Sequence, residues 1–237
     1  MQLIFPQEYV DYKNSMQWFD YVKRIDKRQS TLNFEKIYVF EHDDVYTAGK
    51  SIQNNQTENQ IKKIHGVTVV YSDRGGLWTW HGKGQVVVYF IYNIYLRKLS
   101  LSSFLNAVES IVVESLVFEF ARLSGKSLQQ LGIQVYADDK KRGFWIKQNN
   151  TNTISKIGFI GLRIINGFVC HGISINYDND LKFFDYINPC GLGDVKITSI
   201  KDVITRSGNT NNALDINFFK SHLGESLFSK LDILHGC

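Results

Sequence analysis

Residues 154–164 read ISKIGFIGLRI, and residues 168–176 read FVCHGISIN. Short apolar runs of this kind, rich in β-branched and aromatic residues, predict β-strands. With residues 143–147 (GFWIK) they form a predicted antiparallel meander, and residues 132–137 (GIQVYA) add another short strand. Strands that follow one another without intervening helices indicate an α+β fold with a mixed, largely antiparallel sheet flanked by helices.

The rest of the chain adds elements around this meander. Further strands are predicted at residues 36–41, 67–72 and 86–95. Apolar residues at helical spacing predict helices at residues 7–27, 101–123, 195–204 and 215–232, the second ending at Gly125. Polar, Asn-rich loops are predicted at residues 51–60, 148–153 and 207–212. None of them reads as a domain linker, so residues 1–237 are predicted to form one domain.

The composition limits the functions that the chain can have. A net charge of +4 without a clustered basic stripe does not indicate a nucleic-acid partner. No run approaches about 18 consecutive apolar residues, so neither a transmembrane helix nor a membrane partner is expected. The first residues lack the features of a secretory or transit signal, and three cysteines form no disulfide framework. We therefore expect a cytoplasmic protein in a reducing compartment.

Cys190 is the residue of greatest chemical interest. It lies between Pro189 and Gly191 in a predicted tight turn, and Lys156 lies 34 residues upstream. An ammonium group beside a thiol lowers the pKa of the thiol and favours the nucleophilic thiolate. A lone cysteine is more often a small buried hydrophobe, so the residues alone leave both interpretations open.

Residues 74–85 (RGGLWTWHGKGQ) form a glycine-rich segment between two predicted strands. Glycines let the main chain approach a ligand, Arg74 and His81 supply polar groups, and Trp78 and Trp80 supply apolar walls. The segment is neither a P-loop nor a dinucleotide-binding fingerprint. A ligand-binding loop and a hairpin with bulges are equally consistent with it.

A second histidine, His171, follows Cys170 in the strand predicted at residues 168–176. A ligand, a base and a packed core residue are the alternatives for His171, and we favour a histidine that hydrogen-bonds to the backbone. The spacing of the histidines and cysteines matches no structural zinc pattern. No metal and no other cofactor are therefore expected.

Four motifs taken together resemble one known family. They are EHDDVYTAGK at residues 41–50, RGGLWTWHGKGQVVVYFI at 74–91, SKIGFIGLRI at 155–164 and HGISINYDNDLKFFDYINPCG at 171–191. In this order and spacing they resemble the octanoyltransferase family of lipoate biosynthesis, often called lipoate-protein ligase B. The resemblance spans about residues 36–200 and implies the α+β catalytic domain shared with biotin and lipoate protein ligases.

The resemblance also implies roles for particular residues. Cys190 matches the family's nucleophile, and Lys156 matches the lysine that tunes it. The implied substrate-binding residues form three strips, which are Arg74, Gly75, Gly76, Leu77, Trp78, Thr79, Trp80 and His81, then Phe159, Ile160 and Gly161, and then Gly172, Ile173 and Ser174. The chain departs from the usual family pattern at Lys83 and Phe90, where proline is common, and at Lys50, where arginine is common.

The implied reaction is acyl transfer without ATP or another cofactor. Cys190 would take an octanoyl or lipoyl group from acyl carrier protein as a thioester. Lys156 would exchange protons with the thiol and then with the incoming amine. The acceptors would be lysines on the lipoyl domains of 2-oxoacid dehydrogenase E2 subunits and on the glycine cleavage H protein. An ATP-dependent lipoate or biotin ligase, a non-catalytic acyl or lipoyl-domain binder, and a thiol hydrolase are the alternatives.

Overall fold

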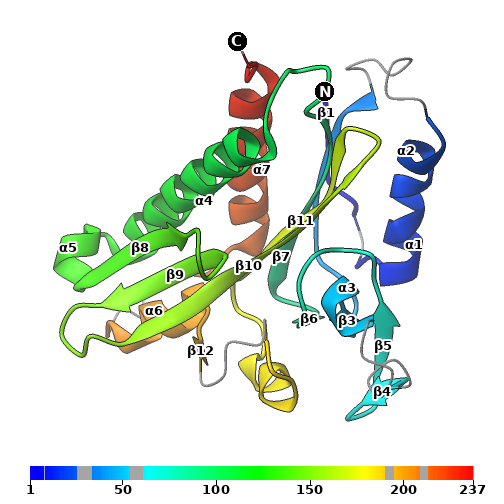
Figure 1. Ribbon diagram of the computed structural model, residues 1–237. Coiled ribbons are helices and arrows are strands. Elements are labelled where there is room, and N and C mark those ends of the chain that lie inside the picture. Colours follow the sequence, from blue (N-terminus) through cyan, green and yellow to red (C-terminus); the bar gives the residue numbers. More distant parts are fainter. Residues whose placement is uncertain (8, 26–33, 54–60, 190–194, 209–212, 237) are drawn as a thin grey trace.

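The computed structural model describes residues 1–7, 9–25, 34–53, 61–189, 195–208 and 213–236 (Figure 1). Within these residues an 8-stranded mixed sheet has the strand order β1-β2-β7-β11-β10-β9-β8, and β12 pairs with β10. All of its pairings are antiparallel except β1 with β2 and β10 with β12. Its strands are β1 (Gln2–Ile4), β2 (Lys36–Phe40), β7 (Gln85–Asn93), β8 (Ile133–Asp138), β9 (Gly143–Gln148), β10 (Ile154–Ile165), β11 (Phe168–Asn176) and β12 (Lys196–Ile197).

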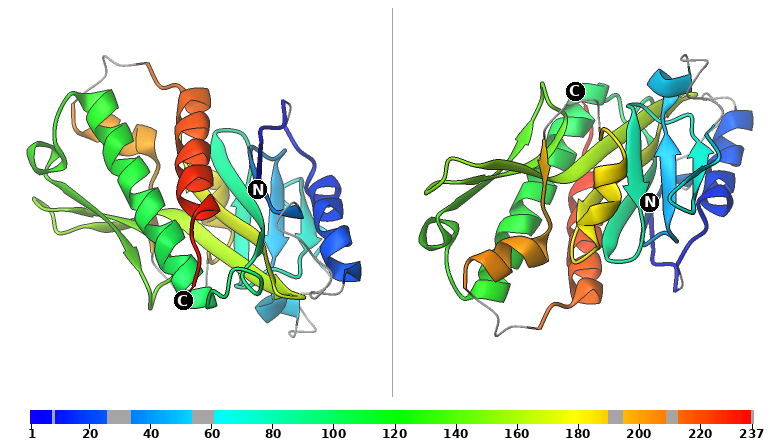
Figure 2. Two further views of the ribbon diagram at one scale, coloured as in Figure 1. Left: turned by 90° about the horizontal axis from the view of Figure 1, so that it is seen from above. Right: turned by 90° about the horizontal axis from the view of Figure 1, so that it is seen from below.

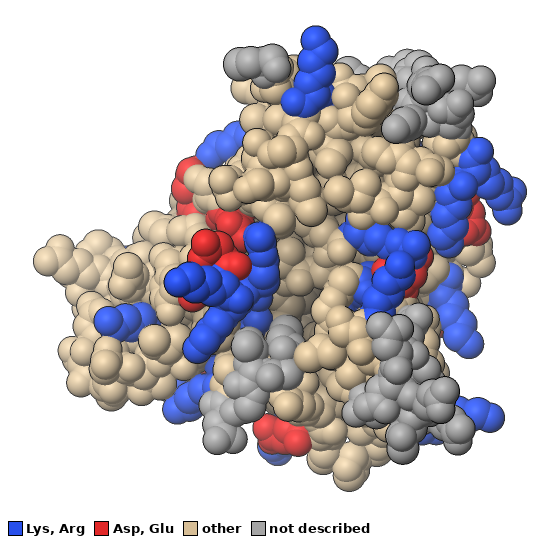
Figure 3. All heavy atoms as spheres, in the orientation of Figure 1, with Lys and Arg blue, Asp and Glu red and all other residues tan. Residues whose placement is uncertain are grey.

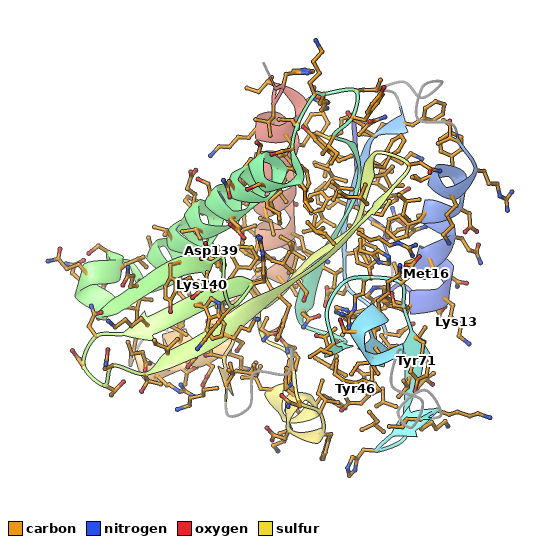
Figure 4. The ribbon with its side chains drawn as sticks, viewed as in Figure 1. Lys13, Met16, Tyr46, Tyr71, Asp139 and Lys140 are labelled. Atoms are coloured by element: carbon orange, nitrogen blue, oxygen red, sulfur yellow. The ribbon has the colours of Figure 1, made fainter. Side chains whose placement is uncertain are left out.

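A second, 4-stranded sheet has the order β4-β5-β3-β6. Its strands are β3 (Val45–Ala48), β4 (Lys63–Ile64), β5 (Val67–Tyr71) and β6 (Trp78–His81). Figure 4 shows Tyr46 and Tyr71 on this small sheet. The hydroxyl of Tyr46 donates to Phe183 O at 2.8 Å, which ties β3 to the 3₁₀ helix η4 (Leu181–Tyr186). The small sheet therefore lies against the segment that leads to Pro189.

Helices cover both faces of the large sheet (Figures 1 and 2). The helices α4, α6 and α7 pack on one face, and α1, η1 and α2 pack on the other. Their bounds, with those of two further short helices, are α1 (Tyr12–Met16), η1 (Gln17–Phe19), α2 (Asp20–Arg24), α3 (Lys50–Gln53), α4 (Leu101–Ser124), α5 (Leu128–Leu131), α6 (Ile200–Arg206) and α7 (Ile216–Asp232). Because both faces are covered, every residue of β7 is buried, which explains its nearly continuous apolar sequence.

The long helix α4 is the element that most resembles a membrane span. By length and composition alone it could cross a membrane, the only such helix found in the described part of the chain. Its apolar face, with Phe104, Val108 and Leu116 fully buried, packs into the core that the large sheet shares with α7. The helix begins at the Ser100 cap and ends at Gly125 with φ of 66°. This is the packing of the core helix of a globular domain.

The structure confirms the predicted strands of the meander, the strands near residues 36, 67 and 86, and the long helix ending at Gly125. The helix predicted at residues 215–232 is α7, and that prediction is also confirmed. Residues 149–151 form a turn, as expected for the loop at 148–153, whereas residues 51–53 of the loop predicted at 51–60 belong to the helix α3. The sequence did not predict β1, β3, β4 or β6, all of which have four residues or fewer.

Two predicted helices begin too early. The helix predicted from residue 7 begins at Tyr12 after the Asp11 cap, because Val10 instead pairs with His42 in a parallel bridge. It is also interrupted by the 3₁₀ turn η1. The helix predicted from residue 195 begins at Ile200 after the Ser199 cap. Lys196 and Ile197, which were predicted to be helical, pair with β10 as strand β12.

A backbone kink occurs in the middle of β11. His171 has φ of 60°, although it is neither glycine nor in a turn. The next residue, Gly172, lies so close to β7 that a Cβ atom would overlap the carbonyl oxygen of Val88. Only glycine permits this approach, so the central strand pair depends on the absence of a side chain at Gly172.

We therefore expect Gly172→Ala to lower the free energy of unfolding by about 3 kcal/mol or more, because β11 and β7 must separate. Urea denaturation monitored by circular dichroism measures this change. Gly161→Ala in the neighbouring β10 is the matched control and should cost less than about 1 kcal/mol, since a Cβ there meets its nearest atom at 3.3 Å. Equal losses in the two variants would contradict the explanation.

Candidate functional site

A narrow pocket lies where the Arg74–His81 segment faces strands β10 and β11. Its lining residues come from the three sequence strips and from two further positions, and they are Arg74, Gly76, Leu77, Trp78, Thr79, His81, Tyr89, Phe159, Ile160, Gly161, His171, Gly172, Ile173 and Ser174. The pocket thus brings together all the predicted substrate-binding residues except Gly75 and Trp80. Strand pairing explains the meeting of two strips, because Phe159 lies opposite Ser174 and Gly161 lies opposite Gly172.

Trp80 lies elsewhere, although the sequence suggested it as an apolar wall. Its ring is buried and stacks on Phe183 of η4 with centroids 4.6 Å apart. It lines a second, larger pocket together with Lys83. Trp80 therefore packs against η4, away from the candidate site, while Trp78 lines that site.

Buried Arg74 fixes one wall of the pocket. Its guanidinium donates to the carbonyls of Thr47, Gly75 and Leu77 at 2.8–2.9 Å, and also to the Thr47 hydroxyl. The amide of Gly75 donates to Leu162 O of β10 at 3.2 Å. The loop is thereby bonded to both sheets, and the charge of Arg74 is directed away from the cavity into backbone oxygens.

Two neutral histidines lie at the pocket, since His81 lines it and the ring centroid of His42 is 5.4 Å from that of His81. Burial lowers the pKa of His42 to about 4, and it lowers the pKa of His81 well below the usual range. His42 donates to Val10 O at 2.6 Å and accepts from the Tyr89 hydroxyl at 3.0 Å, while His81 donates to the Gln85 side chain at 2.7 Å. Uncharged imidazoles are compatible with an apolar ligand in this pocket.

His171 makes a different contact from the one that the sequence suggested. Its Nε2 donates to the Asp73 carboxylate at 2.7 Å, so the expectation of a backbone hydrogen bond is wrong. Asp73 in turn pairs with Arg163 of β10. Burial lowers the pKa of His171, and the hydrogen bond from His171 lowers the pKa of Asp73. Asp73 lies 98 residues from His171 in the sequence, and no local sequence pattern predicts this contact.

Lys156 is almost fully buried, with a relative exposure of 1%. Its Nζ donates to Arg142 O at 2.7 Å and lies 5.0 Å from the centroid of the Trp145 ring and 5.2 Å from that of Phe159. Arg142 belongs to the turn between β8 and β9, where Figure 4 shows Asp139 and Lys140. The amine is therefore held beside the pocket, because Phe159 is one of its lining residues.

A β-bulge explains how Lys156 reaches that position. The pairing of β10 with β9 shifts between Lys156 and Gly158, which leaves Ile157 as an extra residue. Side chains three apart on a regular strand point to opposite faces, and one extra residue reverses that relation. The bulge thus lets Lys156 and Phe159 share a face.

Cys190 and Gly191 lie outside the described residues, so the predicted meeting of Cys190 with Lys156 stays a prediction. The residue before them, Pro189, pairs with Trp78 in an isolated parallel bridge. Trp78 lines the pocket. The described part of this turn therefore ends at the pocket wall, near the strip that includes Phe159.

The residues that depart from the usual family pattern do not line this pocket. Lys83 lies with its Nζ 5.9 Å from the centroid of the Tyr9 ring, and Phe90 is fully buried in the main core. Lys50 is exposed at the start of α3. These replacements leave the described pocket lining unchanged.

A family model for the lipoyl protein ligase A/B catalytic domain matches residues 11–227. The chain belongs to this family. One relative is the octanoyltransferase of Rickettsia bellii, 32% identical over 216 residues that cover 89% of this chain and 94% of the relative. Another is the octanoyltransferase of Bacteroides fragilis, 31% identical over 224 residues that cover 93% and 91%. The family resemblance and the acyltransferase class expected from the sequence are thereby confirmed.

Two solved structures share the fold. A bipartite lipoate protein ligase from Thermoplasma acidophilum superimposes with a TM-score of 0.55 at 12% identity, covering 98% of this chain and 83% of that chain. LipL1 of P. falciparum, solved with lipoate, gives a TM-score of 0.54 at 13% identity, covering 98% and 62%. The predicted α+β fold with a mixed, largely antiparallel sheet is confirmed as that of lipoate protein ligases.

Sequence reasoning missed two residues at the site, Tyr89 and Asp73. Tyr89 lines the pocket and bonds to His42, whereas Asp73 lies outside the lining and accepts a hydrogen bond from His171. A buried tyrosine in a strand has no sequence signal that separates a pocket wall from ordinary core.

The neutral histidines make stability depend on pH. Because the folded pKa of His42 is about 4 and an unfolded histidine titrates near 6.5, the unfolded chain binds more protons between these values. Stability is therefore complete above about pH 6.5 and falls as the pH drops toward 4. His42 alone should cost about 1 kcal/mol between pH 7.5 and 5.5. Urea unfolding at both pH values measures the loss.

The matched variant is His42→Gln, which keeps a polar side chain without a titrating group. We expect its stability to change less between the two pH values than that of the wild type. An identical pH dependence in the two proteins would show that His42 does not contribute.

Proposed function

We propose that the chain transfers an octanoyl or lipoyl group from an acyl carrier protein to a lysine of a lipoyl domain, in lipoate biosynthesis. The observation that carries the proposal is the similarity to octanoyltransferases over about nine-tenths of the chain. The pocket supports it, since its lining includes the apolar residues Trp78, Phe159 and Ile173, whose character matches that of an acyl chain. A thioester is already activated, so the transfer needs no ATP.

In the proposed mechanism Lys156 takes the proton of Cys190, and Cys190 attacks the thioester carbonyl as a thiolate. The carbon–sulfur bond to the carrier breaks, Lys156 gives its proton to the departing carrier thiol, and the acyl group is held as a thioester on Cys190. The acceptor lysine then attacks as a neutral amine and forms an amide. Lys156 takes the proton released by the amine and returns it to the sulfur of Cys190, which leaves as the thiol.

The position of the Lys156 side chain supports this role. Nearly buried between two aromatic rings and bonded to a backbone carbonyl, its amine is held in place beside the pocket. A fixed amine beside the pocket is suited to proton exchange with groups that bind there. Backbone amides of the strips around Gly161 and Gly172 are candidates for stabilising the oxyanion.

The proposal includes partners and compartment. On the face shown in Figure 3, Lys and Arg side chains gather in two groups on either side of a hollow, which suits an acidic carrier protein. The proposed acceptors are the lipoyl domains of 2-oxoacid dehydrogenase E2 subunits and the glycine cleavage H protein. We further propose that residues 1–237 act as one catalytic domain in a reducing cytoplasm, where the Cys190 thiol stays free.

The proposed nucleophile gives a direct test. Cys190→Ser should abolish transfer, because a serine hydroxyl is not ionised by a neighbouring amine. Intact-protein mass after incubation with octanoyl carrier protein should show a wild-type adduct one octanoyl group heavier, which hydroxylamine removes. Cys170→Ala is the control and should still form the adduct, because Cys170 is buried and burial raises its pKa to about 12. Wild-type rates in Cys190→Ser would refute the mechanism.

Lys156→Ala tests the proposed proton carrier. We expect acylation to slow by about 100-fold or more, the usual size of a general acid–base contribution. Stopped acylation reactions analysed by mass spectrometry give the rate, and circular dichroism checks the fold. Unchanged acylation in a folded variant would remove Lys156 from the mechanism.

An ATP-dependent lipoate ligase is the second candidate, because one solved structure with this fold is described as a bipartite lipoate protein ligase. The two activities differ in their activated substrate. Transfer from octanoyl carrier protein without ATP supports the octanoyltransferase, and modification of a lipoyl domain by free octanoate that requires ATP supports the ligase.

A further inference from the structure

The turn that joins β8 to β9 is fastened at several points. The Asp138 carboxylate accepts hydrogen bonds from the backbone amides of Lys140 and Lys141 at 2.9 and 2.8 Å. The indole nitrogen of Trp145 donates to the carbonyl of Lys141 at 3.0 Å. An aspartate that bonds to amides two and three residues ahead fixes the shape of a turn. The position of the next carbonyl, that of Arg142, is therefore well defined.

The Arg142 carbonyl holds the amine of Lys156, whose Nζ donates to it at 2.7 Å. Lys156 lies directly opposite Trp145 in the pairing of β10 with β9, and its Nζ is 5.0 Å from the centroid of the Trp145 ring. The indole that bonds to the turn thus also lies against the amine. A lysine side chain without such contacts samples many rotamers, so these contacts select one direction for the amine.

Gly143, the residue after the turn, has no room for a side chain. Its φ is 141°, a backbone conformation that favours glycine. A Cβ atom there would lie 2.5 Å from Lys156 Cε, 3.0 Å from Lys156 Nζ and 2.6 Å from the carbonyl oxygen of Gly158. The end of the lysine side chain thus occupies the volume that a side chain at position 143 would need.

A second glycine shows what a backbone role alone requires. Gly132 comes directly before β8 and has φ of 66°, and a Cβ there would meet nothing closer than the Asn150 side chain at 3.8 Å. Gly143 pairs with Asp138 where the hairpin closes, so its positive φ also has a use in the turn. Only Gly143 of these two glycines is in addition in contact with the lysine.

We propose that Gly143 is a positioning residue for Lys156 in the acyl-transfer step, an inference that rests on the proposed function. The missing side chain lets Lys156 extend across the start of β9 to the Arg142 carbonyl, with its amine beside Phe159 of the pocket. Carbon atoms in ordinary contact lie about 3.5–4.0 Å apart, so an alanine Cβ at 2.5 Å forces a shift of about 1 Å. A misplacement of about 1 Å can cost about 100-fold in rate.

Gly143→Ala tests the role through the rate of acyl-enzyme formation. Rapid-quench reactions with octanoyl carrier protein, followed by intact-protein mass, give the rate constant and the half-saturating concentration of the carrier. We expect the rate constant to fall by about 100-fold and the half-saturating concentration to stay unchanged, because the substitution displaces a buried amine and no surface group. Gly132→Ala is the matched control, and its rate constant should equal that of wild type.

The pH profile distinguishes a displaced amine from a damaged hairpin. A thiol without assistance ionises near about pH 8.5, so above this pH the thiolate forms without a proton acceptor. The rate constants of Gly143→Ala and Lys156→Ala should therefore rise toward that of wild type between about pH 7 and about pH 9.5. A loss in Gly143→Ala that stays constant over this range would show general structural damage and would overturn the positioning role.

A double-mutant cycle gives an independent check. When Gly143→Ala is added to Lys156→Ala, the rate constant at pH 7 should change by less than about twofold, because no amine is left to displace. A further loss of about 100-fold in the double variant would mean that Gly143 acts independently of Lys156, and would overturn the inference.

The other outcomes distinguish a failed positioning role from a failed proposed function. A wild-type rate in Gly143→Ala, or in Lys156→Ala, overturns the positioning role while acyl transfer stands. A wild-type protein that forms no adduct with octanoyl carrier protein refutes the proposed function itself. If Gly143→Ala does not fold, Asp138→Ala decides, because it removes the surface acceptor that shapes the turn. Its rate should fall by a smaller factor with the same pH dependence, and an unchanged rate overturns the inference.

Discussion

The backbone contacts of Arg74 hold the candidate site together. Its guanidinium donates to the carbonyl of Thr47 in the small sheet, and the amide of the next residue, Gly75, donates to Leu162 in the large sheet. Hydrogen bonds from a charged donor are stronger than neutral ones, and a buried carbonyl left without a partner is costly. The loop therefore has little freedom to move, and the pocket between the sheets has one shape.

Burial determines the charge state of the histidines at that pocket. These histidines are held neutral because water cannot reach them, and their hydrogen bonds to Val10, Tyr89 and Gln85 replace the lost hydration. The buried amine of Lys156 lies beside the aromatic rings of Trp145 and Phe159. A neutral interior with an amine beside it is an arrangement suited to an apolar chain with a reactive carbonyl.

Much of the fold was predictable because it depends on local pattern. The long helix α4 has apolar residues at helical spacing, a serine cap and a glycine stop, and strands β8 to β11 follow one another through short turns. The failures have physical causes. All four residues of β6 are buried, so Trp78 to His81 show no alternation of apolar and polar residues. The segment before Tyr12 forms a bridge to His42 through Val10 and is not helical. Tertiary pairing overrode local propensity at both places.

The sequence by itself determined the motifs, their order and hence the family, together with the residue types that line the pocket. It also determined that a thiol and a lysine belong to one proposed mechanism, through a resemblance and not through geometry. Only the tertiary structure decided that Trp78 faces the pocket while Trp80 turns away, and that His171 bonds to Asp73. Such facts depend on contacts between residues far apart in the chain, and local periodicity carries no information about which distant segments meet.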